Sequence, residues 1–221
     1  MPATIANLGP GFDALGMAVD VYDRFHITLA ERPAVLFRGE GAPGLSREEA
    51  PLVARAAEAV ARRVGRAAAF AIQVDAAIPV ARGLGSSAAA IVGGLVAANH
   101  LLGLPLDQAA LLDMAVALEG HPDNVAAALL GGVVVVAADG EGVRCGRFLP
   151  RLALGIVLAV PRLAIATEEA RAVLPRTVPL SDAVFNLSRA ALLVTALLTG
   201  DASLLPTALD DRLHQPYRAR L

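Results

Sequence analysis

The sequence contains no lysine, because all 19 of its basic residues are arginine. A phosphate-binding loop of the Walker type needs a lysine on the phosphates, and Schiff-base catalysis needs a side-chain amine. Both chemistries are therefore excluded. A phosphate site in this chain must use backbone N–H groups, arginine or a metal ion.

Cysteine and charge are also scarce. The single cysteine, Cys145, cannot form an intramolecular disulfide, and the N-terminus lacks the charged head and apolar run of a signal peptide. These features favour a cytoplasmic setting. With 18% charged residues and a net charge of -2, the chain does not resemble a nucleic-acid-binding polyelectrolyte, and 56% apolar residues argue against disorder.

Residues 83–106 carry no formal charge, and this length raises the possibility of a membrane span. Alanine and glycine dominate the segment, however, and it includes Ser86, Asn99 and Pro105. We expect a helix buried in protein rather than in lipid, and no membrane contact.

Hydrophobic periodicity predicts a mixed α and β protein rather than a regular βαβ array. The 221 residues can form one large domain or two small ones, and a second unit is expected to start near Leu152. Half-buried strands are predicted at 25–29 and 70–74, a fully buried strand at 133–136, and a further strand at 152–160. Helices are predicted at 52–64, 107–118, 167–174 and 181–200. Asp107 is expected to cap the second of these helices and Ser181 the last.

The strongest local signal is the segment 79–89, which reads PVARGLGSSAA. Gly83 and Gly85 permit close backbone approach, and Ser86 and Ser87 stand where a helix would begin. Together they predict an anion site built from N–H groups and a helix dipole. On these residues alone, a glycine-rich turn that caps a core helix is an equal alternative.

Two other catalytic interpretations of this loop are disfavoured. Gly83, Gly85 and Ala88 satisfy a relaxed dinucleotide-binding fingerprint, but the loop does not directly follow a predicted strand and no acid ends a second strand about 20 residues on. A nucleophile elbow needs glycine two places after the serine, where Ala88 or Ala89 stands.

Residues 79–88 match the pattern Pro-x3-Gly-Leu-Gly-Ser-Ser-Ala, which resembles the phosphate loop of the superfamily of galactokinases, homoserine kinases, mevalonate kinases and phosphomevalonate kinases. Residues 2–16 (PATIANLGPGFDALG) and 119–125 (EGHPDNV), followed by two glycines, resemble the N-terminal and central motifs of its homoserine kinase branch. Three motifs in this order are specific. The resemblance covers nearly the whole chain, including residues 167–171 and 214–218.

This resemblance implies a two-domain α+β fold. Residues 1–151 would form an ATP-binding domain similar to domain 2 of ribosomal protein S5, and residues 152–221 a ferredoxin-like domain. The family's C-terminal motif, Gly-x-Gly-Pro-Ser, is absent from the 221 residues, and Met1 falls at the start of the first motif. We therefore expect a truncated C-terminal domain, weak nucleotide binding and little turnover by this chain as written.

The implied activity is ATP-dependent phosphorylation of the side-chain hydroxyl of L-homoserine, a step of threonine biosynthesis, with ATP and Mg²⁺ as cofactors. A homodimer is a possible assembly, and no nucleic-acid partner is expected. The alternatives are another kinase of the superfamily, acting on mevalonate, shikimate or a sugar, and a catalytically silent relative that binds a metabolite.

The resemblance also assigns the nucleotide side of the site. Ser87 and Glu119 would hold Mg²⁺, which prefers oxygen ligands and keeps several waters. The alternative for Glu119 is a solvated acid at a helix end. The adenine contacts are unassigned, because Pro51 stands where the family often has asparagine. The predicted nucleotide-binding residues are Pro79, Arg82, Gly83, Leu84, Gly85, Ser86, Ser87 and Ala88.

On the substrate side, homoserine carries an ammonium and a carboxylate. Asn7 and Asp13 fit the ammonium, whereas His121, Arg171 and Arg218 fit the carboxylate, where arginine can engage two oxygens. The alternatives are that Asp13 organises its own turn and that the arginines are surface residues.

The catalytic assignment rests on Asn124, which occupies the position of a catalytic aspartate in mevalonate kinases. An amide cannot take a proton, so positioning and charge stabilisation are expected to carry the reaction, with Thr167 near the transferred phosphate and with Ser87 and Glu119. Asp123 is expected to point elsewhere. His26, His100 and His214 are expected to be structural.

Overall fold

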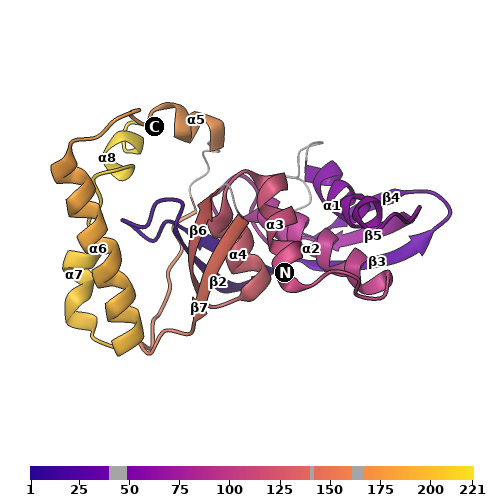
Figure 1. The fold of residues 1–221 in the computed structure, drawn as a ribbon, viewed down its shortest axis with the longest axis horizontal. Helices are drawn as coiled ribbons and strands as arrows, with labels where there is room; N and C mark the ends of the chain where they lie inside the picture. Colours follow the sequence, from indigo (N-terminus) through magenta and orange to yellow (C-terminus); the bar gives the residue numbers. More distant parts are fainter. Residues whose placement is uncertain (40–48, 140–141, 161–166) are drawn as a thin grey trace.

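The computed structural model describes residues 1–39, 49–139, 142–160 and 167–221 (Figure 1). Two sheets and the helices packed on them form an elongated body. Helices α6 and α7 lie at one end of the body, and the smaller sheet lies at the other (Figure 1).

The larger sheet has the strand order β1-β2-β6-β7, with every neighbouring pair antiparallel. Its strands are β1 (Pro2–Ala6), β2 (Leu15–Tyr22), β6 (Val133–Asp139) and β7 (Gly142–Phe148). The chain between β1 and β2, residues 7–14, forms the loop that later contributes to the site; we call it the β1–β2 loop.

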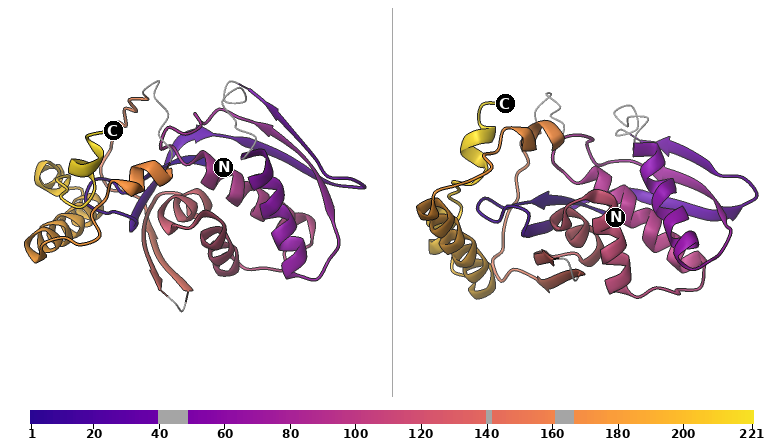
Figure 2. Two further views of the ribbon diagram at one scale, coloured as in Figure 1. Left: turned by 90° about the horizontal axis from the view of Figure 1, so that it is seen from above. Right: turned by 45° about the horizontal axis from the view of Figure 1, so that its top comes forward.

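The smaller sheet has the order β3-β5-β4, in which β3 pairs antiparallel and β4 parallel with the central strand. Its strands are β3 (Arg24–Ala30), β4 (Ala34–Arg38) and β5 (Ala69–Asp75), and α1 (Glu49–Arg63) connects β4 to β5. Figure 2 shows this sheet with α1 along one of its faces.

The main core lies between the helices and both sheets. It joins Val53 of α1 and Phe70 of β5 to the helices α2 (Ser86–Leu101), α3 (Gln108–Glu119) and α4 (Pro122–Leu130). Helices α1 and α2 approach closely, because a Cβ on Gly94 would come within 2.4 Å of the Val53 carbonyl oxygen. The uncharged segment 83–106 thus contains a helix buried in protein, as expected.

Most of the local predictions are confirmed. The strands at 25–29 and 70–74 form, the Asp107 side chain caps α3, and Gly120 ends that helix with φ 90°. The strand at 133–136 also forms, but its full burial was wrong, because Val135 is 36% exposed while Val133 and Val134 are buried. Helices cover one face of this sheet, and the other face is covered only in part.

The described residues after β7 contain helices and no strand, so the predicted strand at 152–160 was wrong. Residues 153–160 have no neighbouring strand within the described chain to complete their hydrogen bonds, and Val157 is 94% exposed. The ferredoxin-like sheet expected here therefore does not form among the described residues. The helices are α5 (Thr167–Ala172), α6 (Leu180–Thr199), α7 (Leu205–Ala208) and α8 (Gln215–Arg218), with a 3-10 turn at Ala202–Leu204.

Helix α6 packs on the large sheet. Its residues Leu193 and Leu197 form a third core cluster with Leu15 of β2 and Val133 of β6. Pro179 precedes the helix as its cap, so the prediction that Ser181 caps it was wrong, whereas Gly200 ends it in the left-handed conformation as expected. By length and composition alone α6 could cross a membrane, but core helices pass the same test.

Candidate active site

A cavity of about 370 Å³ lies where the β1–β2 loop, the glycine-serine loop and the start of α4 meet, with residues of α5 and α8 in its wall. It brings together residues that are up to 215 positions apart in the chain, from Ala6 to Leu221. All the predicted catalytic and substrate-binding residues line it, namely Asn7, Asp13, Ser87, Glu119, His121, Asn124, Thr167, Arg171 and Arg218.

The glycine-serine loop enters α2 through Gly85, which has φ 68° and ψ 32°. Gly83 is also left-handed, with φ 70°, and both positions favour glycine for that reason. The backbone N–H groups at the start of this 16-residue helix, which has no acid in its first turn, suit an anion. Residues 82–87 line the cavity; Ala88 is fully buried, and neither it nor Pro79 is among the lining residues.

Ser87 and Glu119 meet in the cavity, where the serine hydroxyl donates a hydrogen bond of 2.7 Å to the carboxylate. The Glu119 side chain is only 9% exposed, so it is not a solvated acid. Burial raises its pKa above the ordinary value, although the Ser87 hydrogen bond and the nearby His121 oppose this shift. The pair fits Mg²⁺, since hydroxyl and carboxylate oxygens are its preferred ligands.

The protein alone does not complete a metal site in the described part of the chain. No group of three or more histidine, cysteine, aspartate or glutamate side chains gathers there in a metal-binding arrangement. Such a site is suited to an ion that takes its other ligands from phosphate and water, as Mg²⁺ does.

The β1–β2 loop places Asp13 in the cavity by means of unusual backbone conformations. Asn7 and Asp13 have φ of 66° and 57°, which asparagine and aspartate tolerate better than most residues. The Asn7 side-chain oxygen accepts a hydrogen bond of 3.0 Å from the Asp13 backbone N–H. The Asp13 carboxylate forms an ion pair with Arg171 of α5, at 2.5 Å.

The two predicted arginines share an aromatic neighbour. The guanidinium carbons of Arg171 and Arg218 lie 5.4 and 5.3 Å from the centre of the Phe12 ring, and Arg218 Nε donates to the Ala170 carbonyl. Burial and the neighbouring Arg171 lower the pKa of Arg218. Both arginines are therefore held in place rather than free at the surface.

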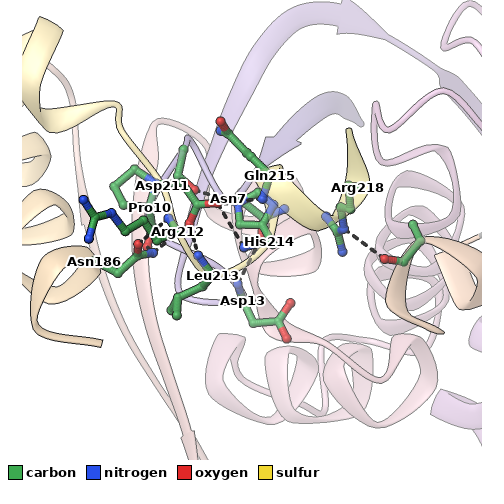
Figure 3. A network of polar contacts seen from close by, with 12 residues as sticks. Asn7, Pro10, Asp13, Asn186, Asp211, Arg212, Leu213, His214, Gln215 and Arg218 are labelled. Atoms are coloured by element: carbon green, nitrogen blue, oxygen red, sulfur yellow. Dashed lines mark hydrogen bonds and ion pairs between the residues drawn. The ribbon is translucent and has the colours of Figure 1, made fainter. Parts of the chain in front are cut away.

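A second polar network anchors the β1–β2 loop to the C-terminal helices (Figure 3). Asn186 of α6, 2% exposed, donates to the Pro10 carbonyl and to Asp211 Oδ1, at 3.1 and 2.8 Å. Asp211 in turn accepts from the backbone N–H groups of residues 213–215, and His214 Nε2 donates to the Gly9 carbonyl at 2.7 Å.

Sequence reasoning missed Asn186 and Asp211 and treated His214 as structural. An aspartate ahead of a short helix is a capping signal that could have found Asp211. Nothing in the sequence pairs Asn186 with Pro10, because 176 positions separate them.

Asn124 and Asp123 stand in the first turn of α4. Asp123 was expected to point elsewhere, but the structure includes it among the cavity-lining residues, at 2% exposure. Its carboxylate accepts a hydrogen bond from the Asn124 backbone N–H, at 2.8 Å, and burial raises its pKa. The Asn124 amide oxygen accepts a hydrogen bond of 2.7 Å from the Thr4 hydroxyl.

Known proteins match this chain over its whole length. The GHMP kinases N terminal domain matches residues 51–132. The homoserine kinase of Moorella thermoacetica is 49% identical over 222 residues, which cover 100% of this chain and 75% of that protein. The homoserine kinase of Deinococcus radiodurans is 45% identical, with 100% and 72% covered.

The crystal structure of homoserine kinase from Cytophaga hutchinsonii superposes with a TM-score of 0.82 at 31% identity, covering 100% of this chain and 73% of that one. The chain belongs to the homoserine kinase family. Its α+β fold is that of the GHMP kinases, as the three motifs predicted. In this homoserine kinase family member, the glycine-serine loop lies within the matched N-terminal domain, whereas Thr167, Arg171 and Arg218 lie outside that match.

Proposed function

We propose that the cavity binds MgATP and L-homoserine side by side and transfers the γ-phosphate of ATP to the homoserine side-chain hydroxyl, a step of threonine biosynthesis. The observation that carries the proposal is the shared cavity. An anion-binding loop faces an aspartate and two arginines across a space of about 370 Å³.

The nucleotide would be held by its phosphates. The N–H groups at the start of α2 would donate to them, and Ser87 and Glu119 would supply two oxygen ligands to Mg²⁺. When bound, Mg²⁺ neutralises charge on the phosphates.

The acceptor would be held by its two charges. Its ammonium suits the Asp13 carboxylate, with Asn7 fixing the loop, and its carboxylate suits Arg171, Arg218 and His121. Mevalonate has a carboxylate but no ammonium, so it would draw Arg171 away from Asp13 and leave Asp13 without a partner, whereas a neutral sugar offers neither charge to the pair. The charge pattern thus favours an amino-acid substrate over these alternatives.

In the transfer itself, the homoserine oxygen forms a bond to the γ-phosphorus while the bond from that phosphorus to the bridging oxygen breaks, and ADP leaves with the electron pair. The hydroxyl proton passes to water or to a phosphate oxygen. Asn124 cannot act as the base, because an amide does not accept a proton, so its role would be orientation. Thr167, at the first turn of α5, would contact the transferred group.

A substrate panel tests this function. Purified chain is incubated with MgATP and L-homoserine, mevalonate, shikimate or galactose, and ADP release is measured. We expect the highest kcat/KM with L-homoserine. Equal or better turnover of mevalonate would overturn the assignment. Binding of homoserine by calorimetry with no ADP release would instead support a silent metabolite-binding protein. A cytoplasmic setting and a homodimer remain predictions.

A further inference from the structure

Thr4 lies beneath the cavity and contacts two parts of the site at once. It is fully buried in β1, with 0% of its surface exposed. Its backbone N–H donates to the Leu84 carbonyl in the glycine-serine loop, at 3.0 Å, and its hydroxyl donates to Asn124 Oδ1 in α4, at 2.7 Å. One residue thus connects the proposed phosphate loop to the amide beside the proposed acceptor.

The contact depends on the glycine at position 85. A Cβ on Gly85 would lie 1.9 Å from the Thr4 hydroxyl oxygen, which is closer than a carbon atom tolerates, and 3.2 Å from Asn124 Oδ1, which is a tight contact. The absence of a side chain lets the loop rest directly on the Thr4–Asn124 pair. The loop, Thr4 and Asn124 therefore form one packed unit, and a shift of one displaces the others.

The neighbours of Asn124 also determine which groups its amide oxygen and its amide nitrogen face. The Thr4 hydroxyl donates to the oxygen, and the Asp123 carboxylate, which only accepts when ionised, lies 3.5 Å from the nitrogen. The amide nitrogen carries two hydrogens. With its oxygen engaged by Thr4, the group that Asn124 can offer to the cavity is an N–H donor.

We propose that Thr4 is a positioning residue for phosphoryl transfer: its hydroxyl fixes the Asn124 amide with the N–H group toward the reacting oxygen and holds it in register with the phosphate loop. This rests on the proposed function, since Asn124 is assigned to the acceptor there. A donor at this place stabilises charge on the acceptor or phosphate oxygen but removes no proton. Thr4 itself touches neither substrate.

The test compares two substitutions that separate the hydroxyl from the shape of the side chain. Thr4→Val keeps the shape and removes the hydroxyl, whereas Thr4→Ser keeps the hydroxyl. We expect Thr4→Val to lower kcat about 10- to 100-fold, with the KM values for homoserine and ATP within about threefold, because misplacement near the reacting atoms acts on the transition state. Thr4→Ser should stay within about threefold of wild type. Thr28→Val, the same change at an exposed position of β3, is the control and should leave kcat unchanged.

A double-mutant cycle checks that Thr4 acts through Asn124. In an Asn124→Ala background, Thr4→Val should cost less than about threefold in kcat, because the amide it positions is gone. The proposal would be overturned if Thr4→Val lowered kcat equally in both backgrounds, or if Thr4→Val kept the wild-type kcat. It would also be overturned if Thr4→Ser lowered kcat as much as Thr4→Val. If Thr4→Val does not fold, Thr4→Ala replaces it, since it removes the hydroxyl without placing a methyl group against the amide oxygen.

A spectroscopic readout keeps this proposal separate from the proposed function. In ¹⁵N-labelled protein, the side-chain NH₂ resonances of Asn124 are identified by their loss in Asn124→Ala. We expect them to shift in Thr4→Val and to stay in place in Thr4→Ser. Unchanged resonances in Thr4→Val would refute the contact. If the wild-type chain turned over mevalonate, shikimate or galactose as well as L-homoserine or better, the proposed function would fail, and this comparison would still decide whether Thr4 holds the amide.

Discussion

Asp13 and Arg171 form an ion pair of 2.5 Å inside the cavity, although these two residues are proposed to hold opposite ends of the same substrate. Each residue of the pair neutralises the charge of the other. A zwitterionic amino acid can replace both partners at once, with its ammonium at Asp13 and its carboxylate at Arg171. A ligand with a carboxylate alone would have to break the pair and leave Asp13 unpaired, which costs binding free energy.

Loss of Arg171 should therefore weaken the binding of homoserine and leave the binding of the nucleotide unchanged. We expect Arg171→Ala to raise the KM for homoserine about 10- to 100-fold, since an arginine–carboxylate pair is lost, with the KM for ATP within about threefold. Steady-state kinetics with each substrate varied measures both. Arg176→Ala, an exposed arginine a few residues away, is the control. An unchanged KM for homoserine would contradict the assignment.

Glu119→Gln should weaken the use of magnesium far more than it weakens the fold. The substitution keeps the shape of the side chain and an acceptor for Ser87, but it removes the charge that attracts the cation. We expect kcat/KM for MgATP to fall at least about 100-fold and the Mg²⁺ concentration for half-maximal rate to rise, with Tm within a few degrees of wild type. Ser87→Ala should act in the same direction.

Glu58→Gln is the matched control for this experiment, because Glu58 pairs with Arg62 on the outside of α1. Its magnesium titration should superimpose on that of wild type. If Glu119→Gln and Ser87→Ala both kept the wild-type magnesium dependence, Mg²⁺ would have to bind elsewhere.

Asn124→Asp should lower kcat and not supply a missing base. The new carboxylate would stand next to Asp123, which is buried and has a raised pKa, so two like charges would compete for one poorly solvated site. The wild-type kcat–pH profile should show no ionisation from position 124. A strong gain in kcat together with a new acidic limb would show that the pocket can use a base.

Local signals in the sequence were enough for much of the fold. The Asp107 cap, the Gly120 and Gly200 helix ends and the glycine-serine loop depend on neighbouring residues, so the sequence predicts them. The strand predicted at 152–160 failed for the opposite reason. An apolar run specifies a strand only when another strand lies beside it, and no described strand does.

The candidate site also contains contacts that local sequence signals cannot predict. The Ser87–Glu119 pair joins positions 32 apart, and only the resemblance to a known family suggested it. The contacts of Thr4 with Asn124 and of Asn186 with Pro10 span 120 and 176 positions. Polar residues at such distances carry no periodicity, and any of several partners would satisfy them. Their pairing follows from the tertiary fold alone.

A polar network around Asp211 holds the start of α8 and hence Arg218. Burial alone would raise the pKa of Asp211, but the hydrogen bonds from Asn186 and three backbone N–H groups outweigh it, so the pKa lies below its ordinary value of 3.8. A carboxylate with a lowered pKa in the folded state stabilises the protein above its unfolded-state pKa. That stability is lost as the pH falls through the folded-state pKa.

Asp211→Asn should therefore be destabilising at pH 7, by about 1 to 3 kcal/mol, because an amide nitrogen would replace an oxygen that now accepts backbone N–H groups. Urea unfolding from pH 7 down to pH 3 measures the free energy of unfolding of both proteins. The difference between them should shrink as the pH falls below 3.8, where the wild-type carboxylate becomes protonated. Asp210→Asn, at the exposed neighbouring position, should follow wild type throughout. A deficit in Asp211→Asn that stayed constant down to pH 3 would mean that shape, and not the charge of Asp211, holds α8 in place.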